Sequence, residues 1–95
     1  MDEVLLSKIR LSVVTELIIA DRLTFSELQS ALEVTNGNLS AHLARLVAEK
    51  YIDEKKQFIG RRPSTRYRLT SKGRDALLTH VAWLNRIVGD SARKK

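Results

Sequence analysis

The first hydrophobic pattern along the chain predicts a helix. Between Val4 and Ala20, apolar residues recur every three or four positions, which is the spacing of one helix face. They form two stripes, the first with Leu5, Ile9, Val13 and Leu17, the second with Leu11, Val14 and Ile18. One small core needs a single stripe. We therefore expect either a second subunit against the other stripe or a helix buried on most of its circumference.

Two shorter helices are predicted next. Thr24 and Glu27 have the spacing of a capping box, so a helix is expected from about 25 to 33. After turn-forming residues, Thr35 is placed to cap a further helix from about 36 to 49. The side of that helix opposite its leucines carries small or hydrogen-bonding residues: Gly37, Asn38, Ala41, Ala44, Arg45 and Ala48. Two short helices joined by a tight turn form a helix-turn-helix.

The pattern then changes to period two. Residues 51–59 and 66–70 alternate as the strands of a hairpin, and the loop tip between them holds Pro63, the single proline. Thr70 or Ser71 is placed to cap a last helix from about 71 to 89. This helix again has two apolar stripes, one with Leu77, Val81, Leu84 and Val88, the other with Ala76, His80, Trp83 and Ile87.

These elements predict a fold that is mainly α with one small β-hairpin, forming a single domain over residues 1–90. A chain of 95 residues has room for one modest core and no large enclosed cavity. Residues 91–95 are expected to be a frayed basic tail.

Charge is distributed unevenly along the chain. Residues 1–34 hold three basic and six acidic side chains, whereas residues 35–95 hold fourteen basic and five acidic ones. The segment from Lys55 to Arg74 contains eight basic residues and no acidic one. Such a density favours nucleic acid or another anionic surface, and a solvated basic face without a partner is the alternative.

Several function classes are disfavoured. No cysteine is present, so disulfides, thiolate metal sites and a cysteine nucleophile are excluded. The reactive side chains do not converge in sequence, and the four glycines fit no phosphate-binding motif, so we expect neither an enzyme nor a cofactor. The longest apolar run, residues 17–20, is far too short to span a membrane, and the acidic start is unlike a signal peptide. We therefore expect a soluble cytoplasmic protein without a membrane partner.

The order of these elements resembles the winged helix-turn-helix domain of the MarR and ArsR groups of prokaryotic transcription regulators, especially their small single-domain archaeal and bacterial type. Four segments carry the resemblance: Phe25-Ser26-Glu27-Leu28, residues 35–43 (TNGNLSAHL), residues 60–65 (GRRPST) and residues 69–74 (LTSKGR). The resemblance implies double-stranded DNA as partner, and a homodimer held by the first and last helices. Many ArsR proteins sense metals through cysteine and histidine clusters. The absence of cysteine argues against such a site here, although His80 and Asp75 could join a site shared by two subunits.

If the helix at 36–49 enters a major groove, its amino-terminal half and outward face read the bases. Asn38 is the leading candidate because a carboxamide pairs with adenine at two atoms. Asn36 is either a second reader or a helix-start residue that bonds to its own backbone. Arg45 reaches a guanine or a phosphate, or else pairs with Glu49. His42 either lies beside DNA, as in the ArsR pattern, or packs against the preceding helix.

Other residues are predicted to support these contacts. Thr35 and Ser40 suit phosphate, Gly37 lets the helix start approach the backbone, and Ala41 is able to touch a thymine methyl group. In the hairpin, arginines stiffened by the proline are expected to follow an adjacent minor groove, with hydroxyls and a further arginine on phosphates. The hairpin set is Arg61, Arg62, Ser64, Thr65 and Arg66.

The aromatic residues argue against binding of single strands. Such binders stack bases on aromatic side chains placed among basic ones. Here Phe25, Phe58 and Trp83 lie in apolar stripes instead, and Tyr67 is expected to be a packing residue. Structured RNA also fits poorly, because its deep, narrow groove does not admit a helix.

The predicted dimer interface takes apolar residues from both terminal helices: Leu5, Ile9, Leu77, Val81, Trp83, Leu84, Ile87 and Val88. The sequence does not indicate a small-molecule effector. The function predicted is sequence-specific regulation of transcription by a dimer on a pseudo-palindromic operator. The alternatives are a winged helix that binds a protein partner and an architectural protein that binds DNA without sequence preference.

Overall fold

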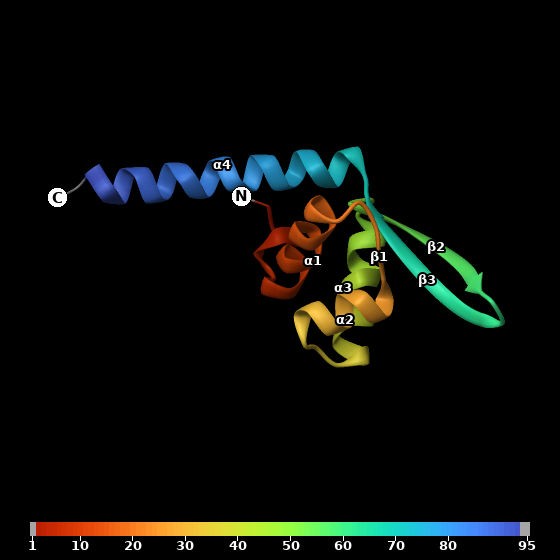
Figure 1. Ribbon diagram of the computed structural model, residues 1–95. Helices are drawn as coiled ribbons and strands as arrows, with labels where there is room; N and C mark the ends of the chain where they lie inside the picture. The colour runs from red at the N-terminus through yellow and green to blue at the C-terminus, as the bar shows by residue number, and fades with distance from the viewer. Residues whose placement is uncertain (1, 94–95) are drawn as a thin grey trace.

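A computed structural model describes residues 2–93 as a helical body with a β-hairpin and one long helix. Figure 1 shows that the hairpin and this helix leave the body in opposite directions. The elements are η1 (Val4–Leu6), α1 (Lys8–Ile19), β1 (Leu23–Thr24), α2 (Phe25–Leu32), α3 (Asn36–Ala48), β2 (Ile52–Ile59), β3 (Arg62–Leu69) and α4 (Ser71–Arg93). The mainly helical fold predicted from the sequence is confirmed.

Threonine hydroxyls fix the starts of three helices. Thr24 accepts a hydrogen bond from the Glu27 backbone amide, and Glu27 accepts one from the Thr24 amide, which completes the predicted capping box. Thr35 caps α3 by accepting from the Asn38 amide at 3.2 Å. Thr70 does the same for α4 through the Gly73 amide at 3.0 Å. These caps explain why the helix starts agree with the sequence pattern.

The first helix is not continuous from residue 4 to 20 as predicted. It breaks at Ser7, whose backbone is extended and whose hydroxyl accepts from the Arg10 amide. The short η1 turn before the break is held by polar contacts instead, since Asp2 Oδ1 accepts from the Val4 amide at 3.0 Å. At the other end of the chain, α4 runs to Arg93, so part of the predicted frayed tail is helical, while residues 94 and 95 lie outside the described residues.

The sheet has three antiparallel strands in the order β1-β3-β2, and β1 was not predicted. The pairing of Ile59 with Arg62 leaves Gly60 and Arg61 as a two-residue turn, and Gly60 has φ of 65°. A glycine with positive φ at the first central position is typical of a type II′ hairpin turn. The prediction of Pro63 at the loop tip was wrong: Pro63 lies in β3 opposite Phe58. Beside the closing pair, this position makes no hydrogen bond across to β2, so a residue without an amide hydrogen fits there.

The core lies where α1, α2, α3 and the base of the hairpin meet. Its buried apolar residues are Val4, Leu5, Val13, Val14, Leu17, Leu28, Leu39, Leu43, Leu46, Tyr51, Ile52, Tyr67 and Leu77. Two residues predicted for a dimer interface belong to this set. Leu5 is 0% exposed and Leu77 is 6% exposed, so both pack inside one chain and offer no surface to a second copy.

A close contact joins the hairpin to α4. The Tyr51 carbonyl accepts a hydrogen bond from the Thr70 amide at 3.0 Å, and the Thr70 hydroxyl donates to the Lys50 carbonyl at 2.7 Å. Gly73 lies directly over the same Tyr51 carbonyl, where a built Cβ atom would be 2.1 Å from the oxygen. We call this group of residues, Lys50, Tyr51, Thr70 and Gly73, the joint. It fixes the direction in which α4 leaves the sheet.

The far part of α4 lies beyond the body. Val81, Leu84, Ile87 and Val88 are between 39% and 65% exposed, although the first, second and fourth continue the stripe of buried Leu77 and Ile87 continues that of buried His80. The chain measures 59 × 25 × 21 Å and has a radius of gyration of 15.1 Å, against about 12 Å for a compact chain of this length. Among the described residues, no helix combines the length and apolar character needed to cross a membrane.

Candidate nucleic-acid interface

The outward face of α3 is built from small and polar side chains. Leu39, Leu43 and Leu46 hold the inner face in the core, and each is at most 1% exposed. The opposite face is open to solvent and carries Gly37, Asn38, Ser40, Ala41, Ala44, Arg45 and Ala48. Because glycine and three alanines keep this face low, another surface could approach the helix backbone closely. The longer Asn38 and Arg45 side chains flank it.

Asn38 and Asn36 differ in their surroundings. Asn38 is exposed, and its side chain makes no hydrogen bond to another residue in the described part of the chain. Asn36 accepts a hydrogen bond from the Gln29 side chain of α2, and Gln29 also donates to the Val34 carbonyl at 3.3 Å. Neither of the two roles predicted for Asn36 describes this contact. Asn36 therefore stabilises the turn between α2 and α3, whereas the Asn38 side chain is available to bind another molecule.

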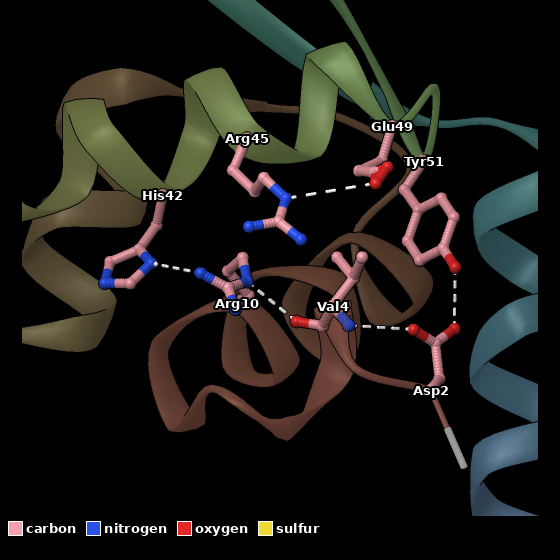
Figure 2. A network of polar contacts seen from close by, with 7 residues as sticks. All are labelled: Asp2, Val4, Arg10, His42, Arg45, Glu49 and Tyr51. Atoms are coloured by element: carbon pink, nitrogen blue, oxygen red, sulfur yellow. Dashed lines mark hydrogen bonds and ion pairs between the residues drawn. The ribbon is translucent and has the colours of Figure 1, made fainter.

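His42 of α3 is hydrogen-bonded to α1. Figure 2 shows its ring turned toward Arg10, whose Nη1 donates to His42 Nδ1 at 3.1 Å and whose Nε donates to the Val4 carbonyl at 2.7 Å. An arginine only donates, so the lone pair of Nδ1 accepts and a neutral ring carries its proton on Nε2. Neither of the two roles predicted for His42 includes this contact with α1. From helical periodicity alone, Arg10 is simply a polar position of α1. It reaches His42 only because α1 packs on α3.

Arg45 lies next along α3, on the same side as His42. Its guanidinium is 3.9 Å from a Glu49 carboxylate oxygen, which is the predicted i,i+4 pair, and its side chain is 47% exposed. A single exposed ion pair at this distance contributes little to stability. Arg45 is therefore available to exchange Glu49 for an anionic group of a binding partner.

The hairpin presents the second basic surface. Arg61 lies in the turn and Arg62 begins β3, and both are exposed. Farther along β3, Ser64, Thr65 and Arg66 are partly exposed. Strand alternation separates these side chains, because Arg62, Ser64, Arg66 and Arg68 share one face and Pro63, Thr65 and Tyr67 share the other. The predicted hairpin residues therefore do not form one surface.

Two tyrosines hold the base of the hairpin. Tyr67 is 5% exposed and donates to Glu54 at 3.1 Å, so it is a packing residue, as predicted. Burial raises its pKa, and the Glu54 charge acts in the same direction. Tyr51 donates to Asp2 Oδ2 at 2.6 Å (Figure 2), and burial together with this bond raises its pKa to about 12. Both phenols stay protonated at neutral pH. The Tyr51 bond joins the start of the hairpin to the amino-terminal segment, while the Tyr67 bond lies within the hairpin.

The described residues include no group of three or more His, Asp or Glu side chains arranged to hold a metal ion. His80 is 4% exposed and lies against Trp83, with ring centroids 5.5 Å apart, while Asp75 is exposed on the same helix. The pair offers at most two ligands from one chain.

The sequence matches a family described as winged helix DNA-binding domain over residues 9–88. The chain belongs to this family. The winged helix resemblance inferred from the sequence is thereby confirmed, and the hairpin of β2 and β3 is the wing. α2 and α3 form the helix-turn-helix of this winged helix DNA-binding domain. A comparison with curated proteins finds no match.

Solved structures share the fold. A transcriptional regulator homologue from Pyrococcus horikoshii superposes with a TM-score of 0.86 at 25% identity, covering 94% of this chain and 88% of that one. Reduced HlyU from Vibrio cholerae has a TM-score of 0.68 at 25% identity, with 90% and 81% covered. A mutant MarR from E. coli, complexed with operator DNA, has a TM-score of 0.69 at 24% identity. There 83% of this chain matches 55% of MarR.

Proposed function

We propose that this winged helix protein regulates transcription by binding a pseudo-palindromic DNA site as a homodimer. The observation that carries the proposal is the outward face of α3, which is low, uncharged over most of its area and flanked by Asn38 and Arg45. A surface of this kind suits a major groove, because side chains that end in hydrogen-bonding groups then reach base edges. The solved structure of a similarly folded MarR with operator DNA supports it.

The residues of the interface have separate tasks in this proposal. Asn38 reads a base and Arg45 binds a guanine or a phosphate, while Gly37 and Ala41 let the helix approach. Thr35, Asn36 and His42 border the DNA but mainly hold α3 in place through the contacts described above. Phosphates are bound by Ser40 and by the wing residues Arg61, Arg62, Ser64, Thr65 and Arg66.

Dimerisation in this proposal uses the exposed part of α4. Val81, Leu84, Ile87 and Val88 form the apolar surface, together with half-buried Trp83 of the same helix. Half-buried Ile9 of α1, which was also predicted for the interface, lies beside Leu32 and Val34. Two copies related by a two-fold axis would present two α3 helices to successive major grooves, about one helical turn apart.

The proposal is tested by selecting bound sequences from a pool of random duplex DNA at moderate salt. We expect an inverted repeat. We then expect Asn38→Ala to weaken binding to that repeat roughly tenfold to a hundredfold and to leave binding to random DNA almost unchanged, since one bidentate base contact gives about 1–3 kcal/mol of discrimination. Affinities are measured by fluorescence anisotropy.

The wing provides the contrasting result. Arg61→Ala combined with Arg62→Ala should weaken binding to both DNAs and reduce the slope of log affinity against log salt by about 0.9 for each phosphate that is no longer neutralised. Thr79→Ala, at an exposed position on the side of α4 opposite its apolar face, is the control and should change neither. A steep salt dependence without any enriched repeat would instead indicate nonspecific architectural binding. Negligible binding would indicate a protein-interaction module.

A further inference from the structure

The end of the wing is apolar as well as basic. Phe58 is 74% exposed and Ile59 is 61% exposed, and neither belongs to the core. Pro63 lies directly across from Phe58 on the same face of the hairpin, and Ile59 lies on the other face beside Arg62. We call Phe58, Ile59 and Pro63 the apolar tip. Phe58 was expected in an apolar stripe, but in the structure solvent covers it.

Positive charge surrounds the apolar tip. Arg61 occupies the turn beyond it, Arg62 pairs with Ile59, and Lys56 lies two residues before Phe58 on the same face. No acidic residue occurs between Lys55 and Arg74. A binding partner must therefore offer anions around an apolar interior. The minor groove of DNA has this form, because phosphates line its edges and stacked bases form its floor.

We propose that the apolar tip is a wedge, in which Phe58 and Ile59, on the two faces of the hairpin, enter the minor groove beside each half-site, partly unstack the base steps that they contact and bend the duplex. This inference rests on the proposed function. Apolar side chains inserted between base steps bend DNA toward the major groove in several minor-groove binders. Two paired strands with their side chains are wider than the undistorted groove of about 6 Å, so entry of the tip requires the groove to open.

The wedge has a consequence for specificity. Pyrimidine–purine steps such as TA and CA/TG unstack and kink more easily than other steps. A wedge therefore favours such a step at a fixed distance outside each half of the repeat, without any hydrogen bond to its bases. This preference adds to the bases read by α3.

The experiment compares the wild type with Phe58→Ala combined with Ile59→Ala in the same random-duplex selection, followed by energy transfer between dyes at the two ends of the selected DNA. For the wild type we expect an inverted repeat flanked by pyrimidine–purine steps and a shortened end-to-end distance. The double variant should enrich the same repeat, lose the flanking preference and the shortening, and bind about tenfold more weakly.

Two controls keep the comparison specific. Phe58→Leu keeps a bulky apolar group and should retain the flanking preference and most of the shortening. Ile19→Ala removes an equally exposed apolar side chain, 75% exposed on α1, and should behave as wild type. A repeat without flanking preference, or wild-type complexes whose DNA is not shortened, would overturn the wedge while the proposed function stands. Failure of every protein to enrich a repeat would overturn the proposed function itself.

Discussion

Gly73 shows how one missing side chain determines a contact between two elements. It lies in the first turn of α4, and a Cβ atom there would be 2.1 Å from the Tyr51 carbonyl oxygen and 2.8 Å from a Leu69 methyl carbon. The carbonyl is not free to move, because it already accepts from the Thr70 amide. Glycine is therefore required at this position by close approach rather than by backbone angles.

We expect Gly73→Ala to destabilise the fold by about 3 kcal/mol, since overpacking against fixed backbone cannot relax through a rotamer change. Equilibrium denaturation in urea measures the change in unfolding free energy. Gly89→Ala in the same helix is the control, because no atom lies within 4 Å of its built Cβ and alanine favours a helix by about 0.5–1 kcal/mol. Similar destabilisation by both substitutions would contradict the contact argument.

The candidate site was partly predictable from single residues. The exposure of Asn38 and Arg45 follows from helical spacing, since both lie opposite the buried leucines. The partners of Asn36 and His42 did not follow from spacing, because they come from α2 and α1. Contacts between elements depend on how the elements pack, and a pattern within one helix contains no information about that.

At the scale of elements, α3 ends in a Schellman motif with an unusual residue. The Tyr51 amide donates to the Leu46 carbonyl and the Lys50 amide to the Val47 carbonyl, both at 2.9 Å, which are the two bonds of that motif. The residue that turns the chain is Lys50, with φ of 64°. Glycine usually occupies this position, since a Cβ atom makes the left-handed conformation cost about 1–2 kcal/mol.

Lys50→Gly should therefore stabilise the protein by about 0.5–1 kcal/mol, the gain in the folded state being reduced by the greater freedom of glycine in the unfolded chain. For a domain of this size, that is a rise in melting temperature of about 2–8 °C. Lys50→Ala serves as control, because it removes the same charge and keeps the strained conformation, so no rise is expected. An equal rise in melting temperature for both variants would show that the gain comes from removing the Lys50 charge and not from relieving the backbone.

The elements found by the sequence pattern are those with local signals. Capping threonines and leucine spacing predicted α2 and α3 to within a residue at each end. β1 was missed because it has two residues and exists only by pairing with Arg66 and Tyr67, more than forty positions later. The break at Ser7 was missed because apolar spacing continues through it, while the polar contacts that cause it involve side chains.

At the scale of the whole molecule, the apolar face of α4 has more area than one chain covers. The face is buried at Leu77 and His80, and it continues beyond the body through Val81 and Leu84 to Val88. A monomer would leave this apolar surface in water. Covering it would contribute a favourable free energy of roughly 25 cal/mol for each Å² buried. The projection of α4 on one side of the body and of the wing on the other also accounts for the large radius of gyration.

We expect the wild type to be a dimer at micromolar concentration and Leu84→Glu with Val88→Glu to be a monomer that keeps its helical content, because two charges would have to enter an apolar interface. Analytical ultracentrifugation and circular dichroism measure these properties. Ala82→Glu, on the opposite side of α4, places a similar charge outside the interface and should remain dimeric. A monomeric wild type would contradict the assignment of this face.

The rigidity of the joint at Tyr51, Thr70 and Gly73 has a consequence for the length of the DNA site. β2 spans eight residues, so the end of the wing lies roughly 23 Å from the joint. A rotation of about 10° at the joint would displace that end by about 4 Å, slightly more than the rise of roughly 3.4 Å per base pair along the DNA axis. In the proposed dimer held by α4, a stiff joint would therefore limit the spacing between half-sites that the protein tolerates to within about one base pair.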